Sequence, residues 1–259
     1  MRRPEGEAPV RLFDMHCHLD FAPDARAAAD AMAAAGLGAF ATTVTPTGFE
    51  RASALFAGCE NVRTGLGLHP WWLADGRCGE ADVEEFVRLA ETTRYIGEVG
   101  LDFGKRCEGS GDAQLAAFTR IAAACADGGR LLSLHAVKAA GCVLDVFERT
   151  GALASNACVF HWFSGTSDEL TRVIRSGCFV SVNPRMLETK RGRAYAQAIP
   201  EDRLLLETDM PPEGEPYDPA TELARLERLV VDLAGLRRAD PPALAARIAD
   251  TSARLLQFP

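Results

Sequence analysis

The sequence predicts a (β/α)8 TIM barrel that forms one domain over residues 1–259 and ends in an additional C-terminal helix. Short apolar runs rich in Val, Ile, Leu and Phe alternate with amphipathic, Ala-rich stretches, which is the rhythm of repeated βα units. Eight such runs occur, and a length of 259 residues suits one α/β barrel. The content of 47% hydrophobic and 25% charged residues is typical of a globular chain and excludes a disordered one.

Each apolar run is expected to form one strand. The strands are predicted at residues 10–15, 39–45, 62–68, 95–99, 131–134, 158–160, 179–182 and 203–207. Helical periodicity follows them, most clearly at residues 25–35, 83–91, 113–126 and 221–233. The last helix, over 242–256, begins after two prolines, where a missing backbone N–H costs least. A doubly wound open sheet is the alternative, but no G-x-G-x-x-G follows the first strand and no P-loop motif occurs.

Charge and cysteine usage exclude several classes of protein. The formal net charge of −8 argues against a protein that coats duplex nucleic acid, although it leaves a local phosphate site open. No apolar run approaches the roughly 20 residues that cross a bilayer, and no apolar segment of a secretory signal precedes the first strand. The 8 cysteines form no C-x-x-C pair, which is typical of reduced thiols. We therefore expect a cytoplasmic protein with no membrane partner.

The histidines lie only at the carboxyl ends of predicted strands. They are His16, His18, His69, His135 and His161. Two acids, Glu98 in IGEVGLD and Asp209 in LLLETDMP, end two further strands. Because the carboxyl ends of all strands of a barrel open on one face, these side chains are expected to meet there.

This set of donors predicts a metal centre. His16 and His18 are two residues apart on one strand, so both imidazoles face the same way and can reach one ion, whereas Cys17 faces the core. A mixed nitrogen and oxygen set admits Mg²⁺, Mn²⁺ or Zn²⁺ without naming one of them. Because four histidines and two carboxylates exceed what one open catalytic ion needs, we expect two divalent ions per chain, bridged by Glu98. The expected ligands are His16, His18, Glu98, His135, His161 and Asp209.

Six ordered motifs carry a family resemblance. They are DMHCHLDF, GLGLHP, GEVGLDF, LLSLHA, FHWFSG and LLLETDMP. In order and spacing they resemble the TatD-like metal-dependent deoxyribonucleases of the amidohydrolase superfamily. The resemblance implies a barrel that hydrolyses DNA phosphodiesters, often as a 3′-to-5′ exonuclease. It further implies that the first ion is held by His16, His18, Glu98 and Asp209, and the second by Glu98, His135 and His161.

A narrower similarity lies in GGRLLSLHA, FHWFSG and FVSVNPRMLETKRG. These stretches resemble the QatD-like branch found beside anti-phage defence genes, which implies partners in a defence complex.

The chain also departs from the common TatD-like pattern. Val137, followed by Lys138, stands where an arginine usually contacts substrate phosphate, and lysine supplies a point charge without a bidentate fork. Trp71 replaces the common second histidine after GxHP, and Trp162 replaces the cysteine of HCFSG.

The ligand set predicts a hydrolysis that needs no protein nucleophile. A water bound to the metal ions loses its proton readily, and Asp209 is expected to accept that proton. His69 either orients a substrate phosphate or caps the GLGLHP turn, and Glu207 either contacts a histidine N–H or forms a structural salt bridge. The expected substrate is DNA, as single strands or frayed ends.

Basic residues crowd the segment after the seventh predicted strand. Arg185, Lys190, Arg191 and Arg193 form either a phosphate track or a solvated helix face.

Two other function classes remain open. The first is another amidohydrolase reaction on a lactone, amide or cyclic imide, which is disfavoured because the fourth strand offers Glu98 and no bridging lysine. The second is a metal-binding component of a defence complex with little activity. It is disfavoured because a structural metal site is closed, whereas the six expected ligands surround the open end of the barrel.

Overall fold

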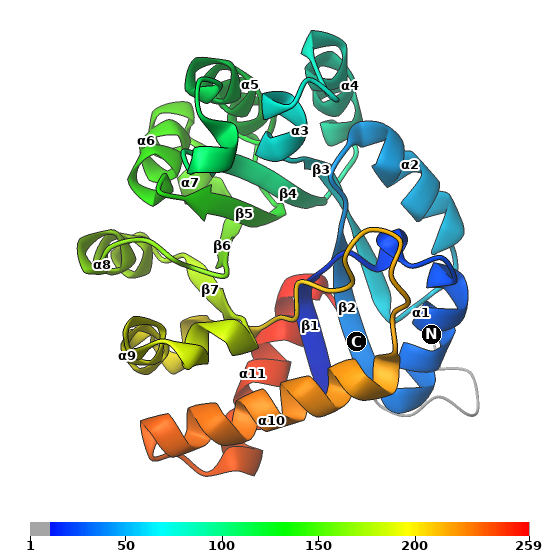
Figure 1. Cartoon of the computed structure of the whole chain (residues 1–259), viewed down its shortest axis with the longest axis vertical. Coiled ribbons are helices and arrows are strands. Elements are labelled where there is room, and N and C mark those ends of the chain that lie inside the picture. The colour runs from blue at the N-terminus through cyan, green and yellow to red at the C-terminus, as the bar shows by residue number, and fades with distance from the viewer. Residues whose placement is uncertain (1–10, 259) are drawn as a thin grey trace. The chain divides into compact units, whose positions relative to one another are not determined.

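The computed structural model describes residues 11–258, in which strands and helices alternate (Figure 1). The strands are β1 (Leu12–Cys17), β2 (Leu37–Thr42), β3 (Val62–Leu68), β4 (Tyr95–Asp102), β5 (Leu131–Val137), β6 (Ala157–His161), β7 (Phe179–Val182) and β8 (Leu204–Leu206). The α-helices are α1 (Ala25–Ala35), α2 (Pro46–Leu55), α3 (Pro70–Ala74), α4 (Glu80–Ala90), α5 (Gly111–Ala124), α6 (Ala140–Thr150), α7 (Ala152–Ser155), α8 (Ser167–Arg175), α9 (Lys190–Ala198), α10 (Pro219–Arg237) and α11 (Pro241–Leu256). Short 3-10 helices are η1 (Leu19–Phe21), η2 (Lys105–Cys107), η3 (Pro184–Glu188) and η4 (Glu201–Arg203).

The strands follow one another in the sheet in sequence order, from β1 to β8. The β1–β2 pair and each successive pair from β3 to β7 are parallel. β8 contacts β1, and the N–H of Asp209, just after β8, donates to the carbonyl of His16 in β1 at 2.9 Å. Parallel strands in this order, joined by helices, have the topology of a (β/α)8 TIM barrel, so the predicted fold class is confirmed. The predicted additional C-terminal helix is α11.

The chain divides into two compact units, the first of which comprises 11–41, 53–63 and 182–258 among the described residues. In this unit α10 and α11 pack against β1. The Phe258 ring meets Phe13 edge-on at 5.1 Å, and the Arg63 guanidinium lies 4.1 Å above the Phe258 ring. Arg63 Nε also donates to the Leu256 carbonyl at 3.1 Å. These contacts fix the end of α11 against the first strand.

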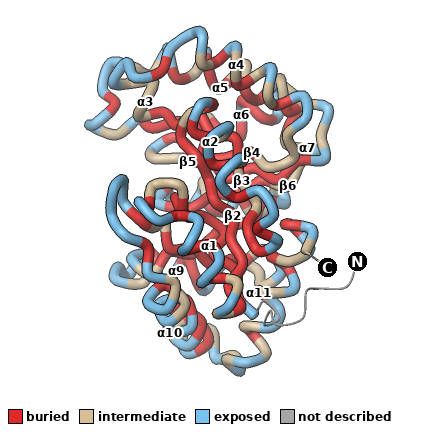
Figure 2. The backbone as a smooth tube through the Cα atoms, turned by 90° about the vertical axis from the view of Figure 1, so that its right-hand side faces the viewer, coloured by how far each residue is buried: buried red, intermediate tan, exposed pale blue. Residues whose placement is uncertain are grey.

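The second unit comprises 42–52 and 64–181. Its centre is the long parallel ladder between β4 and β5, which are side by side in Figure 1 and pair from Tyr95 opposite Leu131 to Asp102 opposite Val137, with one shift of register between Ile96 and Val99. Both strands are almost wholly buried, as Figure 2 shows in red, and their buried residues include the polar side chains of Glu98, Asp102 and His135. α5 packs on β4, and Phe118 of α5 stacks on Phe147 of α6 with ring centroids 5.2 Å apart.

All eight cysteines are free thiols, and seven of them are buried. Cys17 is fully buried and its Sγ lies 3.8 Å from the Phe40 carbonyl on β2, so the prediction that it belongs to the core is confirmed. Within residues 11–258, no helix combines the length and the apolar character that a membrane crossing requires.

Candidate metal centre

The predicted ligands lie at the carboxyl ends of the strands. His16 belongs to β1, and His18 follows that strand directly as the N-cap of η1. His135 belongs to β5, His161 is the last residue of β6, and Glu98 lies within β4. Asp209 comes three residues after the end of β8. The prediction that the histidines avoid the interiors of helices is therefore confirmed.

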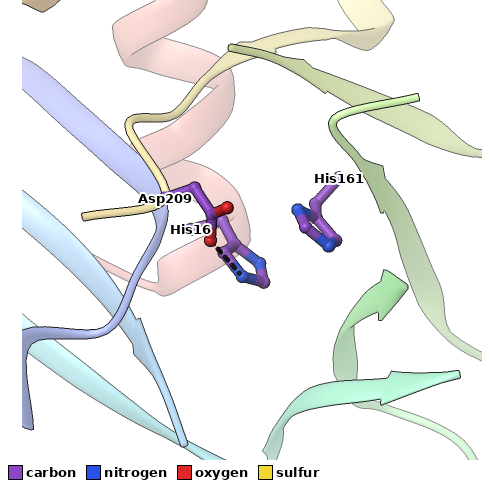
Figure 3. A group of neighbouring side chains, drawn as sticks. All are labelled: His16, His161 and Asp209. Atoms are coloured by element: carbon purple, nitrogen blue, oxygen red, sulfur yellow. Dashed lines mark ion pairs between the residues drawn. The ribbon is translucent and has the colours of Figure 1, made fainter. Parts of the chain in front are cut away.

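The first cluster, His16, His18 and Asp209, lies in the first unit. Asp209 Oδ1 is 3.5 Å from His16 Nε2 and 3.3 Å from His18 Nε2, and Figure 3 marks the His16 pair with a dashed line. The two imidazole rings meet edge to face at 5.2 Å. Asp209 has φ 60, in the left-handed region that a non-glycine residue enters only where its surroundings enforce it. The i, i+2 pattern on β1 thus presents both imidazoles to one carboxylate.

Asp14, which the sequence analysis did not identify, supports this cluster from β1. Its carboxylate accepts hydrogen bonds from the Thr208 N–H at 3.0 Å, the Thr208 hydroxyl at 2.5 Å and the His16 N–H at 3.3 Å. Burial raises the pKa of Asp14 to about 8, although the hydrogen bonds from Thr208 oppose that rise. Strand alternation could have revealed this residue, because Asp14, His16 and His18 are spaced two apart. The result is a buried link between β1 and the segment that carries Asp209.

The second cluster, His69, Glu98, His135 and His161, lies in the second unit. Three imidazole nitrogens converge on Glu98 Oε1: His135 Nδ1 at 2.6 Å, His161 Nε2 at 2.9 Å and His69 Nε2 at 3.0 Å. All four residues are buried, and the Glu98 side chain is only 2% exposed. One donor atom each from His69, Glu98 and His135 lies within 4.8 Å of the others. This buried nitrogen and oxygen set fits a divalent cation, whose bonds of about 2.0–2.2 Å bring ligand atoms to such separations.

A further carboxylate, Asp102, contacts His135 from its other side. Its Oδ2 lies 3.1 Å from His135 Nε2 and accepts the indole N–H of Trp71 at 2.6 Å, while its Oδ1 accepts the Gly104 N–H at 2.7 Å. Burial alone would raise the pKa of Asp102, but the hydrogen bonds from His135, Trp71 and Gly104 lower it to about 2. Burial likewise opposes the charged form of His135, yet the two carboxylates raise the pKa of that imidazole.

Asp102 is a residue that the sequence analysis missed, although a signal was present. Glu98 and Asp102 are four residues apart in one strand, so they share a face. The backbone of Asp102 is held by the Gln114 side chain of α5, which accepts the Asp102 N–H at 2.8 Å and donates to the Asp102 carbonyl at 3.0 Å. Gln114 is fully buried. Asp102 is therefore fixed by both its backbone and its side chain.

Both ring nitrogens of His69 have polar contacts. Its Nδ1 accepts the Trp71 backbone N–H at 3.0 Å, so His69 is the N-cap of α3, which is the capping role that the GLGLHP turn predicted. Its Nε2 faces Glu98, which the sequence did not predict. A role toward substrate phosphate stays a prediction, as does a partner for Glu207, which lies fully buried just after β8.

Apart from His69, the predicted phosphate-binding residues are not members of either cluster. Lys138 is exposed immediately after β5 and has φ 54. Arg185 is exposed in η3, and Lys190 and Arg191 are exposed in the first turn of α9. Arg193 differs, because it is half-buried and its Nη1 donates to the Leu187 carbonyl at 2.5 Å. Three exposed cations thus follow β7, as the sequence predicted, and a fourth follows β5.

Comparisons with known proteins agree with this arrangement. The family model described as TatD related DNase matches residues 13–257. A relative from Enterobacter lignolyticus, described as a 3′-5′ ssDNA/RNA exonuclease TatD, is 32% identical over 216 residues, which cover 77% of this chain and 79% of that protein. A relative of the same description from Musicola paradisiaca is 33% identical over 172 residues, which cover 63% of this chain and 64% of that protein. The match thus spans slightly less than two thirds of the Musicola protein.

Solved structures show the same fold. YJJV, a TatD homologue from Escherichia coli, is 26% identical, with a TM-score of 0.76 over 96% of this chain and 99% of that chain. A TatD family hydrolase from Entamoeba histolytica is 17% identical and shares the fold, with a TM-score of 0.79 over 95% of this chain and 98% of that chain. Because the family model matches residues 13–257, nearly all of the described residues, the chain belongs to the TatD related DNase family.

Proposed function

We propose that this chain is a metal-dependent hydrolase that cleaves the phosphodiester bonds of DNA, acting on single strands or frayed ends from the 3′ end. The observation that carries the proposal is the convergence of three imidazole nitrogens on one buried oxygen of Glu98. Active sites of TIM barrels lie at the carboxyl ends of the strands, which is where these histidine and carboxylate donors are. The relatives described as 3′-5′ ssDNA/RNA exonucleases support the polarity and the substrate class.

We assign two divalent ions, Mg²⁺, Mn²⁺ or Zn²⁺, to the two clusters. His16, His18, Glu98 and Asp209 would hold the first ion, and Glu98, His135 and His161 would hold the second. When bound, such ions lower the pKa of a coordinated water and neutralise charge on a phosphate. Carboxylate and imidazole donors accept each of these three metals, so the donor set does not select among them.

Asp209 is the proposed proton acceptor. Its side chain is 23% exposed, whereas that of Glu98 is 2% exposed, so Asp209 can receive a proton and release it to solvent. The hydrogen bond from its N–H to the His16 carbonyl holds the residue in place while its side chain changes protonation. Glu98, which is buried among three imidazoles, is instead suited to bridge the ions.

Substrate phosphates are assigned to His69, Lys138, Arg185, Lys190 and Arg191. Lys190 and Arg191 lie in the first turn of α9, where a positive charge opposes the helix dipole. Their placement therefore does not serve helix stability, which supports a role in binding phosphate. Lys138, next to Val137, supplies a single charge at the end of β5.

Degradation of a 5′-labelled single-stranded oligonucleotide tests the proposal. With Mg²⁺, Mn²⁺ and Zn²⁺ supplied separately, at least one ion should support a ladder of products shortened from the 3′ end. Glu98→Ala should give no ladder while its circular dichroism spectrum matches that of the wild type. Wild-type-like turnover in metal-quantified Glu98→Ala would contradict the bridging role, and absence of cleavage by the wild type with every ion would contradict the function.

An amidohydrolase reaction on a small lactone or amide is the second candidate. The second cluster favours it in one respect, since buried histidine and carboxylate donors also serve such hydrolases. Against it, β4 places Glu98 in the cluster and contains no lysine between Tyr95 and Asp102. The same protein preparations should therefore hydrolyse a lactone and amide panel far more slowly than DNA, and the reverse order would favour this candidate.

A role in anti-phage defence within the cytoplasm is the finer part of the proposal. The stretches GGRLLSLHA and FHWFSG support the QatD-like branch, and the eight free thiols suit a reducing compartment. The test is a plaque assay on cells that carry the complete gene neighbourhood. Protection that disappears with Glu98→Ala supports an enzymatic role, protection that persists supports a metal-binding component of a defence complex, and absence of protection contradicts the defence role.

A further inference from the structure

Trp71 donates two hydrogen bonds that reach two different histidines of the second cluster. Its backbone N–H donates to His69 Nδ1, and its indole N–H donates to Asp102, which contacts His135. We propose that Trp71 is a positioning residue that decides which ring nitrogen of each histidine faces Glu98, so that His135 offers a lone pair to a metal ion and His69 offers a proton. This inference rests on the proposed metal centre and deepens it.

The first arm of the proposal concerns His69. Its Nδ1 accepts the Trp71 N–H at 3.0 Å, so this nitrogen bears no proton. A neutral imidazole then carries its proton on Nε2, which lies 3.0 Å from Glu98 Oε1. His69 therefore donates a hydrogen bond to the bridging carboxylate. His69 is as close to Glu98 as the assigned ligands are. Because its Nε2 carries the proton, it has no lone pair for a metal ion and instead positions Glu98 through a hydrogen bond.

The second arm concerns His135. Asp102 Oδ2 accepts the Trp71 indole N–H at 2.6 Å and lies 3.1 Å from His135 Nε2. His135 thus has one ring nitrogen, Nε2, against Asp102 and the other, Nδ1, 2.6 Å from Glu98. When an ion takes the lone pair of Nδ1, the single proton of a neutral imidazole lies on Nε2, where the Asp102 carboxylate accepts it. Contacts of this kind to the far nitrogen fix the ring orientation of a metal-bound histidine and its tautomer.

Surrounding contacts keep this arrangement rigid. Gln114 holds the backbone of Asp102, and the Arg106 guanidinium lies 3.8 Å above the Trp71 ring. The Trp71 ring also meets the His135 ring edge to face at 5.8 Å. Trp71 is the residue that departs from the common family pattern at this place, so the contact from its indole N–H to Asp102 belongs to this chain's own sequence, whereas its backbone N–H would hold His69 with most other residues here. The arrangement leaves Glu98, His135 and His161 as ligands of the second ion, which keeps positions open for substrate.

The test compares Trp71→Phe with Trp72→Phe. Trp71→Phe keeps an aromatic ring and the backbone N–H but removes the indole N–H that Asp102 accepts. Trp72→Phe is the matched control, because Trp72 is the next residue of α3 and its ring also meets the His69 ring edge-on, at 5.4 Å against 4.9 Å for Trp71. The indole N–H that Asp102 accepts is that of Trp71, and the Trp72 ring lies 3.9 Å from the Arg77 guanidinium. Calorimetric titration of the metal-free full chain with Mn²⁺ should show affinity about 10–100-fold weaker for Trp71→Phe. The affinity of Trp72→Phe should stay within about twofold of the wild type.

Asp102→Asn gives a second route to the same result if Trp71→Phe folds poorly. Its amide can donate to His135 as well as accept, so the tautomer loses its constraint, and Mn²⁺ affinity should fall to a similar degree. Nitrogen-15 spectra of the Zn²⁺-loaded protein should show His135 protonated at Nε2 and bound through Nδ1, with His69 protonated at Nε2. In Mn²⁺-saturated protein the variants should lose kcat and keep the KM for an oligonucleotide.

The outcomes separate the two proposals. Mn²⁺ affinity of Trp71→Phe or Asp102→Asn equal to that of the wild type overturns the positioning role while the metal centre stands. An equal loss in Trp72→Phe also overturns it, because the effect would then not depend on the Asp102 contact. His69 bound to Zn²⁺ through Nε2 overturns the first arm. A wild-type chain that binds neither Mn²⁺ nor Zn²⁺ instead contradicts the proposed function.

Discussion

Single side chains in the two clusters differ most in their exposure, and this difference assigns their chemistry. Asp209 is partly open to solvent, whereas Glu98 and His16 are buried. A group that exchanges protons with water needs access to it, and a group that holds an ion needs a fixed charge away from competing water. The two carboxylates are therefore not interchangeable, although both lie against imidazoles.

Asp209→Asn separates proton transfer from metal binding. The amide keeps an oxygen near His16 and His18 but is not basic, so kcat should fall by about 10²–10⁴-fold. Its Mn²⁺ affinity should fall much less than that of Glu98→Ala. Steady-state cleavage at saturating Mn²⁺, together with calorimetry, measures both quantities. Retention of wild-type kcat in Asp209→Asn would assign proton acceptance to another group.

Arg191→Ala tests the phosphate track after β7. Loss of one phosphate contact should weaken single-stranded DNA binding and reduce the slope of log K against log salt by about 1. Arg228→Ala is the matched control, since it removes the same charge from α10, where Arg228 pairs with Asp232 at 3.0 Å. Fluorescence anisotropy at several salt concentrations measures the slopes. Equal slopes for both variants would favour a solvated helix face.

The sequence predicted which residues gather at strand ends but not every contact that they make. Spacing alone indicated His16 and His18, because period-two alternation fixes which face a side chain takes. Spacing could not indicate that the Trp71 indole reaches Asp102, because that contact depends on how α3 approaches the end of β4. Asp102 was missed for the same reason, since strand alternation reveals a shared face and not a bonding partner.

The predicted ends of a strand agree with the observed ends where its apolar pattern and its backbone pairing stop at the same residue. β3, β7 and α1 have the predicted bounds. β1 spans Leu12–Cys17 where 10–15 was expected, and residue 10 lies outside the described residues. β4 and β5 continue to Asp102 and Val137, beyond the expected ends at 99 and 134. The apolar runs that were used to predict these two strands end near Glu98 and His135. The hydrogen-bonded ladder between β4 and β5 continues past both residues.

The capping box of α8 provides a test at the level of elements. Glu169 accepts the Thr166 N–H at 2.8 Å and the Gly141 N–H of α6 at 3.1 Å, and Thr166 accepts the Glu169 N–H at 3.2 Å. One carboxylate therefore serves the amino ends of two helices. Glu169→Ala should lower the free energy of unfolding by about 1–2 kcal/mol. Asp168→Ala, at the neighbouring position of the first turn, should cost less, and thermal denaturation of both variants measures the difference.

The same residue gives the sign of a pH dependence. Burial would raise the pKa of Glu169, but hydrogen bonds from Thr166 and Gly141 outweigh that effect and lower it. Its contribution is therefore present above the ordinary glutamate pKa and is lost as the pH falls through the lowered one. The destabilisation by Glu169→Ala should be full at pH 7 and shrink in acid. A difference between variant and wild type that does not change with pH would contradict this linkage.

Over the whole molecule, eight alternating units and a length near 250 residues were sufficient to predict the barrel topology. The short elements were beyond prediction: α3, α7 and the 3-10 helices have too few residues to show a period. α3 nevertheless carries Trp71 and begins at the His69 cap. The short elements, which the sequence pattern reveals least, thus contribute residues to the site, because tertiary contacts and not local periodicity determine their conformation.

Metal binding should couple the site to the stability of the whole chain. The proposed ligands come from strand ends as distant in sequence as His16 and Asp209, and an unfolded chain cannot present them together. An ion that binds only the folded chain stabilises it by about 2.7 kcal/mol at 100 times its Kd. For a chain of this size, Tm should rise by about 5–10 °C between chelator and saturating Mn²⁺.

His135→Ala is the control that ties this rise to the site. It removes one ligand and the contact to Asp102, so most of the Mn²⁺-dependent rise in Tm should disappear even if the metal-free Tm also changes. Arg228→Ala should keep the full rise, because it lies on α10 and pairs with Asp232. Differential scanning calorimetry at a fixed scan rate measures all three proteins with and without chelator. An equal rise in His135→Ala would mean that the stabilising ion binds elsewhere on the folded chain, since a site that has lost a ligand cannot return the same binding free energy.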